Sequence, residues 1–539
     1  MDPLRDWSGA KSNSSVAMFA SYGAKLTENF EKFAQAEAIV EVPAHGPVLR
    51  RTYQQFAEDV ENVRKLLRAH GQAPVVATIA GNTYPHLLWI SATWLEGRTL
   101  CPLNPDEGIE RLKLRLGQLQ QPVSLWFDRG APVDVETLGA LPMRWQSNTT
   151  SPLQPACVRD SNRPMTLIFT SGSTGYAKIV EQMEEQVLAN AQALVQHHGL
   201  DDRTVIATPL PIFHVNALNF SFVCSQLTGG KLVLFEKFHP HQLSEMLAQE
   251  RVHICSVVPH ILQTLLERLQ TLKSESWDEL RYFVTAASAL SPQLAKDLVA
   301  RFPKRVVQGY GLSEAVNFSC LNPIDLNAQD YAKWMTQYER PSIGVPVWGN
   351  EVLIFDECGM SLGVGEKGEV VIRGQIVMRG YQGDTGRQVF EGSVLHTGDV
   401  GFYQEDETGR RFVFICGRLK DTAKRLGQTV SLVEIDDLLS GWSEWGTKAV
   451  AVAFDHQVAG EELAVLVQAE PHQTVPLHEL KQLLEKKCPD YMRPRLIGVT
   501  TQAVRTASGK PIRWKLKPLL AKFHDQMFGP KIIDMGRLD

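Results

Sequence analysis

The chain has 539 residues, of which 44% are hydrophobic and 21% are charged, and its formal net charge is -5. This composition is typical of a soluble globular protein with more than one domain, and the acidic balance argues against a nucleic-acid partner. The eight cysteines include no C-x-x-C pair and no zinc-ligand spacing, so we expect buried thiols in a reducing compartment.

No segment predicts export or membrane insertion. Residues 1–15 lack the apolar stretch of a signal peptide. The most apolar long window, residues 204–235, is interrupted by proline, histidine and amide side chains. We therefore expect no membrane span and a cytoplasmic location.

Strand and helix patterns alternate through the first part of the chain. Residues 74–80 and 254–258 read as buried strands, and residues 259–270 follow with apolar side chains at helical spacing. Residues 282–285 read as a strand, and Ser291 with the following proline predicts the start of a helix. The alternation predicts an α/β architecture with largely parallel sheets.

From about Glu351 the pattern changes. Strands are expected at residues 352–355, 369–373 and 411–415, separated by glycine-rich turns without a helix, which predicts a small antiparallel unit. After Cys416 the expected elements are a helix at 432–439, strands at 449–454 and 463–468, and a helix at 477–487. They predict a compact α+β unit with its own core.

The loop TSGSTGYAK, residues 170–178, follows the apolar run at 165–169. Its glycines let backbone N–H groups approach phosphate oxygens, its hydroxyls donate hydrogen bonds and Lys178 supplies positive charge. The pattern favours a polyphosphate site but is not a Walker A loop. The alternative is a flexible surface loop rich in serine and glycine.

The same loop closely resembles the signature loop of the adenylate-forming (AMP-binding) superfamily, with Ala177 where proline is usual. This superfamily includes acyl-CoA synthetases, peptide-synthetase adenylation domains and beetle luciferases. Four further stretches resemble its motifs in the same order: VQGYGLSEA at 307–315, LHTGDVG at 395–401, GRLKD at 417–421 and RTASGK at 505–510. The resemblance extends from about residue 30 to about residue 516.

The resemblance implies a fold and a division into domains. We expect a large N-terminal domain of two doubly wound αβ subdomains plus a small β-barrel-like unit, hinged to a small α+β C-terminal domain. The ATP- and acid-binding domain would comprise residues 1–417. The mobile domain would comprise residues 418–539, with the hinge near Lys420.

By the same resemblance, the protein joins a carboxylate to the α-phosphate of ATP and releases pyrophosphate. The loop residues implied to wrap the phosphates are Thr170, Ser171, Gly172, Ser173, Thr174, Gly175 and Lys178. Tyr310 would stack on adenine, while Asp399 and Arg418 would contact the ribose. The other implied nucleotide or cofactor contacts are Ala287, Ser288, Ala289, Gly309, Gly311, Ser313 and Gly427.

Four residues are implied to act in the chemistry. Glu314 would hold Mg²⁺, and Lys178 and Lys510 would neutralise charge on the reacting groups, Lys510 from the C-terminal domain. Lys420 would lie at the hinge about which that domain rotates for the second half-reaction. Gly427 would then line the tunnel for a thiol.

The resemblance also implies an acid pocket formed by His214, Val215, Asn216, Asn219, Leu312 and Val316, together with Phe222, Ala286 and Gly311. Relatives that activate amino acids usually have Phe-Asp where this chain has Phe213-His214, which argues against an ordinary α-amino acid. His214 is either a gate of the acid site or a buried core histidine.

The expected ligands are ATP, Mg²⁺, a small carboxylic acid and CoA. The alternative acceptor is the phosphopantetheine of an acyl carrier protein, or an amine. Two other classes remain as alternatives: an ATP hydrolase or kinase that releases ADP, and a non-catalytic binding protein. Residues 321–340 are either a lid or a surface insertion, and the tail at 521–539 has no assigned role.

Overall fold

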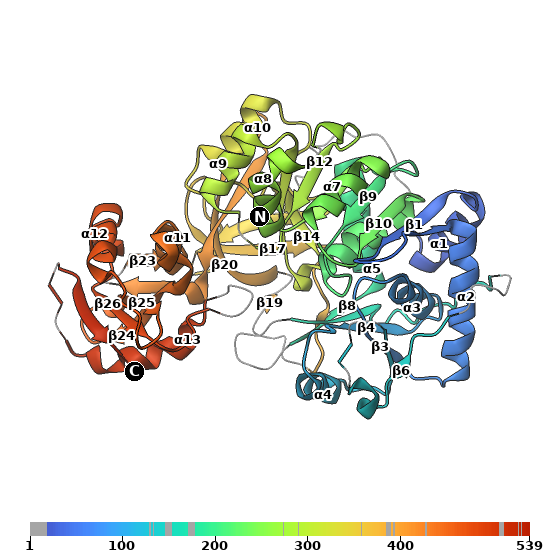
Figure 1. Ribbon diagram of the computed structural model, residues 1–539, viewed down its shortest axis with the longest axis horizontal. Helices are drawn as coiled ribbons and strands as arrows, with labels where there is room; N and C mark the ends of the chain where they lie inside the picture. Colours follow the sequence, from blue (N-terminus) through green and yellow to red (C-terminus); the bar gives the residue numbers. More distant parts are fainter. Residues whose placement is uncertain are drawn as a thin grey trace, which may run out of the picture.

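The computed structural model describes most of the chain. The described residues are 19–128, 131–132, 134–145, 153–170, 178–272, 274–288, 290–356, 358–383, 390–391, 394–425, 428–505, 511–526, 528–529 and 531–538. The described strands form four sheets: two large mixed sheets, a smaller antiparallel sheet and a C-terminal sheet (Figure 1).

Nine of the described strands form the first sheet. Their order is β15 (Val345–Pro346), β14 (Phe318–Leu321), β13 (Arg305–Gly311), β12 (Tyr282–Thr285), β11 (Ile254–Val257), β9 (Val205–Thr208), β10 (Lys231–Phe235), β1 (Glu37–Val42) and β2 (Leu49–Thr52). The strands from β13 to β1 are parallel, whereas β14, β15 and β2 pair antiparallel at the edges. The chain leaves β13 directly into the turn that carries Glu314.

Seven described strands form the second sheet. Their order is β18 (Gly380–Tyr381), β8 (Ile179–Gln182), β7 (Thr166–Phe169), β4 (Thr99–Leu103), β3 (Val75–Ile79), β5 (Val123–Phe127) and β6 (Leu141–Pro142). Strand β8 runs antiparallel to both β7 and β18. Lys178, directly before β8, is thereby placed beside the short strand that contains Tyr381.

Helices cover these sheets and pack with them around a large hydrophobic core and a smaller one on the second sheet. They are α1 (Tyr22–Lys32), α2 (Tyr53–Ala69), α3 (Tyr84–Leu95), α4 (Ile109–Gln118), α5 (Glu184–His198), α6 (Cys224–Thr228), α7 (Pro240–Gln249), α8 (Pro259–Glu267), α9 (Pro292–Arg301) and α10 (Ala328–Thr336). Helix α3, YPHLLWISATWL, is apolar on nearly all sides and is buried almost throughout. A helix with that composition is stable only inside a core.

The third sheet is antiparallel, as the sequence predicts for the region after Glu351. It contains β16 (Asn350–Phe355), β17 (Gly368–Gly374), β20 (Val394–Glu405), β19 (Phe390–Glu391) and β21 (Arg411–Arg418). Helix α10 packs on it, because the Trp334 ring stacks on Phe412 with centroids 3.9 Å apart and an interplanar angle of 3°. Trp334 is 1% exposed, so this part of residues 321–340 is an element of the core, not a surface insertion or a lid.

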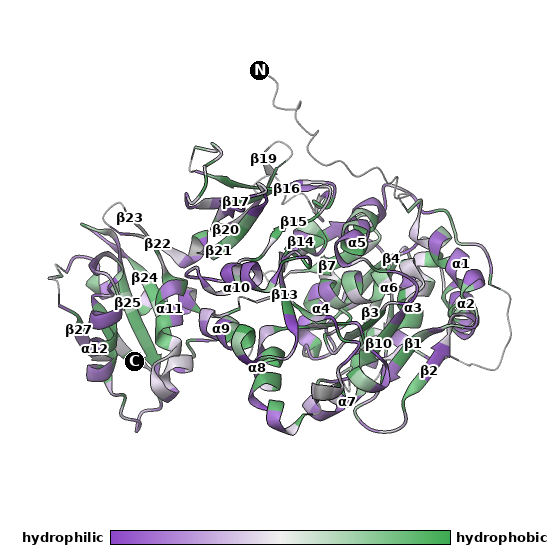
Figure 2. Ribbon diagram, turned by 90° about the horizontal axis from the view of Figure 1, so that it is seen from above, coloured by the Kyte–Doolittle hydropathy of each residue, from purple (hydrophilic) through white to green (hydrophobic). Residues whose placement is uncertain are grey.

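The fourth sheet lies at one end of the molecule (Figure 1). It contains β23 (Gln428–Ser431), β22 (Thr422–Arg425), β25 (Gly460–Gln468), β26 (Leu496–Thr500), β27 (Ile533–Arg537) and β24 (Ala449–His456). The associated helices are α11 (Leu432–Ser440), α12 (Leu477–Lys487) and α13 (Arg513–Leu516). Hydrophobic residues run along β24 and β25 (Figure 2).

Alternate residues of β24 and β25 face two small cores. Ala451 and Val465 pack with Leu480 of α12, whereas Val452 and Leu466 pack with Leu538 from the tail. The tail thus covers one sheet face and adds β27 parallel to β26. Together the four sheets confirm the predicted α/β fold class, with its β-rich unit and its small C-terminal α+β unit.

Candidate functional site

The predicted phosphate loop connects two neighbouring strands. Strand β7 ends at Phe169 and β8 begins at Ile179, and the Thr170 backbone N–H donates to the Lys178 carbonyl at 2.9 Å. This bond closes the base of the loop. Ser171, Gly172, Ser173, Thr174 and Gly175 lie outside the described residues.

Lys178 and Glu314 meet at one aromatic ring. The Tyr381 hydroxyl donates to Glu314 Oε1 at 2.8 Å, and the Lys178 ammonium lies 4.6 Å from the centroid of the Tyr381 ring. Burial, followed by the Glu314 carboxylate, raises the pKa of the Tyr381 hydroxyl, which therefore stays a donor. A cation over an aromatic face is itself a favourable contact.

The turn that carries Glu314 is tight. A Cβ atom on Gly309 would lie 2.6 Å from the Phe318 ring, and one on Gly311 would overlap the Asn317 carbonyl. Val316 has φ +61° and ψ -60°, and the Asn317 N–H donates to the Ala315 carbonyl at 2.6 Å. A positive φ is rare for a β-branched residue, so other contacts must hold this conformation.

A second group of predicted residues lies at strands β13, β20 and β21. The Tyr310 hydroxyl donates to Asp399 Oδ2 at 2.6 Å, and Arg418 Nε lies 3.0 Å from Asp399 Oδ1. Asp399 and Arg418 are cross-strand partners. Burial and the Asp399 carboxylate raise the pKa of the Tyr310 hydroxyl. The structure therefore brings together three residues that the sequence assigns to adenine and ribose.

Other predicted nucleotide contacts lie where parallel strands end. Ala287, with φ +70°, and the exposed Ser288 follow β12, whose last residue Thr285 is in register with Gln308 of β13. Ligands of open α/β sheets bind at this edge. Ala289, Gly427 and Lys510 lie outside the described residues, as does the side chain of Lys420, whose backbone belongs to the turn Leu419–Asp421.

The predicted acid pocket is built on a rare helix type. Residues Asn216–Val223 form a π-helix, a form that is frequent at functional sites. Asn216 Oδ1 accepts from the Ser256 hydroxyl at 2.9 Å. His214 is exposed, so its assignment as a buried core histidine is wrong. Leu312 and Val215 are half-buried, and Val316 is buried.

Two residues that the sequence analysis missed connect these groups. Tyr381 contacts Glu314 across 67 positions, and Gln182 contacts Ser313 across 131 positions. The only sequence signal for Gln182 is a polar residue at the end of a buried strand. Asn219, which was predicted, donates to Gln182 Oε1 at 3.2 Å and to the Val316 carbonyl at 3.3 Å.

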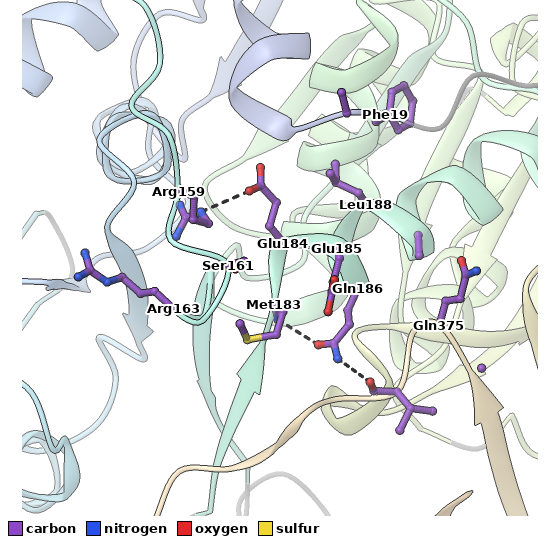
Figure 3. A pocket seen from close by; sticks show the side chains of 14 residues that line it. Phe19, Arg159, Ser161, Arg163, Met183, Glu184, Glu185, Gln186, Leu188 and Gln375 are labelled. Atoms are coloured by element: carbon purple, nitrogen blue, oxygen red, sulfur yellow. Dashed lines mark hydrogen bonds and ion pairs between the residues drawn. The ribbon is translucent and has the colours of Figure 1, made fainter. Parts of the chain in front are cut away.

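A cavity of about 590 Å³ lies elsewhere, at the start of α5 (Figure 3). Arg159 points toward Glu184 there, with Nε 3.6 Å from Oε2. Burial lowers the pKa of the Arg159 guanidinium to about 10. None of the predicted site residues that the structure describes lines this cavity.

Two absences hold for the described residues. They contain no group of three or more His, Cys, Asp or Glu side chains arranged to hold a metal ion. No helix among them is long and apolar enough to cross a membrane.

Comparison with known proteins gives a family match and many relatives. The family model described as "AMP-binding enzyme" matches residues 26–382. The chain is 28% identical over 380 residues to 4-coumarate–CoA ligase 3 of Arabidopsis thaliana, covering 69% of this chain and 66% of that protein. It is 29% identical over 370 residues to 4-coumarate–CoA ligase 1 of Solanum tuberosum, covering 66% and 65%. The match thus spans just under two thirds of the length of these relatives.

Solved structures share the fold at low sequence identity. ATP-bound MatB from Rhodopseudomonas palustris superposes with a TM-score of 0.78 at 20% identity, covering 94% of this chain and all of that one. The o-succinylbenzoate CoA synthetase MenE of Bacillus subtilis, with its acyl-adenylate intermediate, gives a TM-score of 0.77 at 19% identity, covering 94% and 98%.

Proposed function

This chain belongs to the AMP-binding enzyme family, and we propose that it is an AMP-forming carboxylic acid–thiol ligase. In the first half-reaction a carboxylate oxygen of the acid attacks the α-phosphorus of ATP, and pyrophosphate leaves. In the second, the thiol sulfur of CoA attacks the acyl carbon, and AMP leaves. The observation that carries the proposal is the pair of groups described above, Lys178 with Glu314 at Tyr381, and Tyr310 with Asp399 and Arg418.

The first group suits the phosphates of ATP. Lys178 is exposed at the base of the loop, where its ammonium would neutralise phosphate charge. Glu314 is half-buried, and Tyr381 occupies its Oε1, which leaves Oε2 to bind a cation. One carboxylate, completed by phosphate oxygens and water, fits the coordination habit of Mg²⁺. When bound, that ion would offset further negative charge.

The second group suits the nucleoside. Asp399 is 5% exposed, and its two carboxylate oxygens contact Tyr310 and Arg418. A carboxylate can accept several hydrogen bonds, and we assign the ribose hydroxyls as further donors to Asp399. Tyr310 and the turn at Ala287 would flank the adenine. Together these residues orient ATP so that the α-phosphorus faces the acid.

We infer that residues 418–539 form a mobile domain that supplies Lys510. Several of the contacts between the two parts of the chain are polar. Arg340 pairs with Asp437, Lys367 Nζ lies 3.6 Å from Glu434 Oε1, and the Ser431 hydroxyl donates to the Cys416 carbonyl at 3.2 Å. Polar interfaces of this kind permit domain motion. Lys420 lies at the predicted hinge, and Gly427 would line the thiol path after rotation.

The names of the relatives guide the choice of acid. Because they are 4-coumarate–CoA ligases, we propose aromatic propenoic acids as the first class to test, followed by fatty and dicarboxylic acids. We also propose a cytoplasmic location, since all eight cysteines are free thiols. CoA is the proposed acceptor, and the phosphopantetheine of a carrier protein is the alternative.

The test is an acid panel assayed for pyrophosphate, AMP and ADP with ATP and Mg²⁺, with and without CoA. The proposal predicts acid-dependent pyrophosphate and AMP in equal amounts, with sustained turnover only when CoA is present. Slow release that CoA does not affect would move the acceptor to a carrier protein or an amine. Release of ADP would refute the proposal in favour of a kinase or an ordinary ATP hydrolase.

A further inference from the structure

Four buried amide side chains hold the turn that carries Glu314, the strand β14 that follows it and the segment just before β18. Each amide nitrogen donates to a backbone carbonyl. The bonds are Gln182 to Ser313 at 2.9 Å and to Val316 at 3.1 Å, Gln186 to Val377 at 2.7 Å, Asn190 to Phe318 at 2.9 Å, and Asn219 to Val316 at 3.3 Å. Figure 3 shows the Gln186 bond. The amides come from β8, α5 and the π-helix, and all four are buried.

Gln182 has the central place in this set. Its side chain is fully buried, and its Nε2 reaches the carbonyls of Ser313 and Val316, which lie on either side of Glu314 in the sequence. Its Oε1 accepts from Asn219 Nδ2 at 3.2 Å, which fixes the orientation of the amide. Gln182 also ends the strand that begins next to Lys178, so it connects the lysine strand with the glutamate turn.

The carbonyl that both Gln182 and Asn219 bind belongs to Val316, whose backbone is strained. Val316 has φ +61°, and its carbonyl accepts from both Gln182 and Asn219. A valine left without these bonds would relax toward negative φ, because that backbone region is far less crowded for a β-branched side chain. Such a rotation would turn the peptides next to Glu314 and move its carboxylate away from Tyr381.

We propose that Gln182 is a positioning residue that holds Glu314 for the metal–phosphate group of ATP. The proposal rests on the proposed function in one respect, the assignment of Glu314 to Mg²⁺. Gln182 itself touches neither substrate nor metal. It acts through the Ser313–Val316 turn, and its loss should weaken the metal-dependent part of ATP binding, not the contacts of adenine and ribose.

The test compares Gln182→Met, which keeps the size of the side chain but removes the amide, with a matched control. Gln192 of α5 is 2% exposed, and neither its Nε2 nor its Oε1 has a hydrogen-bond partner among the described residues, so Gln192→Met is that control. Glu314→Gln is the reference for loss of the metal ligand. The readout is calorimetric ATP affinity without acid, with and without Mg²⁺, which requires no turnover.

We expect Gln182→Met to lose at least tenfold of the Mg²⁺-dependent gain in ATP affinity, as Glu314→Gln does, while affinity without Mg²⁺ stays within twofold of wild type. Gln192→Met should match wild type. Adding Val316→Gly to Gln182→Met should restore part of the gain, because glycine tolerates positive φ. If Gln182→Met does not fold, Gln182→Asn, whose shorter amide cannot reach both carbonyls, replaces it with the same expectation.

Three results would overturn the proposal. First, Gln182→Met or its replacement could keep the wild-type Mg²⁺-dependent gain in ATP affinity. Second, it could lose ATP affinity equally with and without Mg²⁺, which is the result expected if Gln182 has only a structural role. Glu314→Gln could keep the gain, which removes the metal assignment on which the proposal depends. The ligase activity itself is judged separately by acid-dependent pyrophosphate release from wild type, so its failure is distinguishable from all three.

Discussion

The hydroxyl of Tyr381, in β18 of the second sheet, donates a 2.8 Å hydrogen bond to Oε1 of Glu314, in the turn that follows β13 of the first sheet. The same ring faces the Lys178 ammonium at 4.6 Å. One aromatic side chain thus fixes the separation between a predicted phosphate-binding cation and a predicted metal-binding anion. In the view of Figure 1, β8 lies below the labelled strands β12 and β14 of the first sheet.

Replacing Tyr381 tests this relationship. Tyr381→Phe keeps the ring beside Lys178 but removes the hydrogen bond to a charged group, which should lower kcat for pyrophosphate release roughly 10- to 100-fold. Tyr381→Leu removes both contacts and should lower it further. Steady-state kinetics of the two variants check that kcat falls further in Tyr381→Leu than in Tyr381→Phe. Wild-type kcat in Tyr381→Phe would show that the hydrogen bond has no part in the reaction.

Lys510 is the residue on which the first half-reaction should depend most. Lys510→Ala is expected to reduce adenylation by several orders of magnitude and to leave ATP binding intact, because its charge is needed as charge develops in the transition state. Lys517→Ala, which removes an exposed ammonium paired with Asp455, is the matched control and should be normal. Near-normal adenylation by Lys510→Ala would contradict the assignment.

Gly427 should separate the two half-reactions. Gly427→Phe is expected to block thioester formation and to spare acid-dependent pyrophosphate exchange, since only the thiol path is obstructed. Gly441→Phe is a suitable control, because Gly441 has φ -86° and a Cβ there would lie 3.7 Å from its nearest neighbour. Equal loss of both half-reactions in Gly427→Phe would refute the separation.

Buried histidines should make the protein sensitive to acid. Burial lowers the pKa of His86 to about 4, while its ring contacts the Thr78 hydroxyl at 2.9 Å and the Gly81 carbonyl at 3.0 Å. The unfolded chain binds this proton near pH 6.5 and the folded chain does not, so the free energy of unfolding falls as pH drops from about 6.5 to about 4, by about 3 kcal/mol for this group. Burial lowers the pKa of His198 as well, which acts in the same direction.

Urea unfolding at several pH values between 7.5 and 4.5 measures this dependence. His86→Gln should be less stable at neutral pH but should show a shallower loss of stability with acid, because one proton-binding difference is gone. An unchanged slope in the variant would mean that other groups dominate the acid sensitivity.

Local patterns in the sequence predicted much of the fold. The helix expected after Ser291 is α9, and the Ser291 hydroxyl accepts from the Leu294 N–H as an N-cap should. The helix expected over 259–270 ends earlier, at Glu267. A separate 3₁₀ turn follows it at Leu269–Thr271. Helix ends are weakly specified by periodicity, which explains the difference.

Contacts between distant segments could not be predicted in this way. Neither strand periodicity nor motif spacing indicates that β18 would pair with β8, or that Trp334 would stack on Phe412. Gln182 and Tyr381 were missed for the same reason, since their partners are set by tertiary packing. The pairing of β27, the strand formed by the tail, could not be predicted because its partner β26 is more than thirty positions away.

The most direct test of the central claim follows an oxygen atom. The active acid is prepared with ¹⁸O in both carboxylate positions and is converted completely with ATP, Mg²⁺ and CoA. An acyl-adenylate intermediate predicts that the AMP formed carries one labelled oxygen, because thiol attack breaks the acyl carbon–oxygen bond. Unlabelled AMP, or label found in inorganic phosphate alongside ADP, would contradict the proposed reaction.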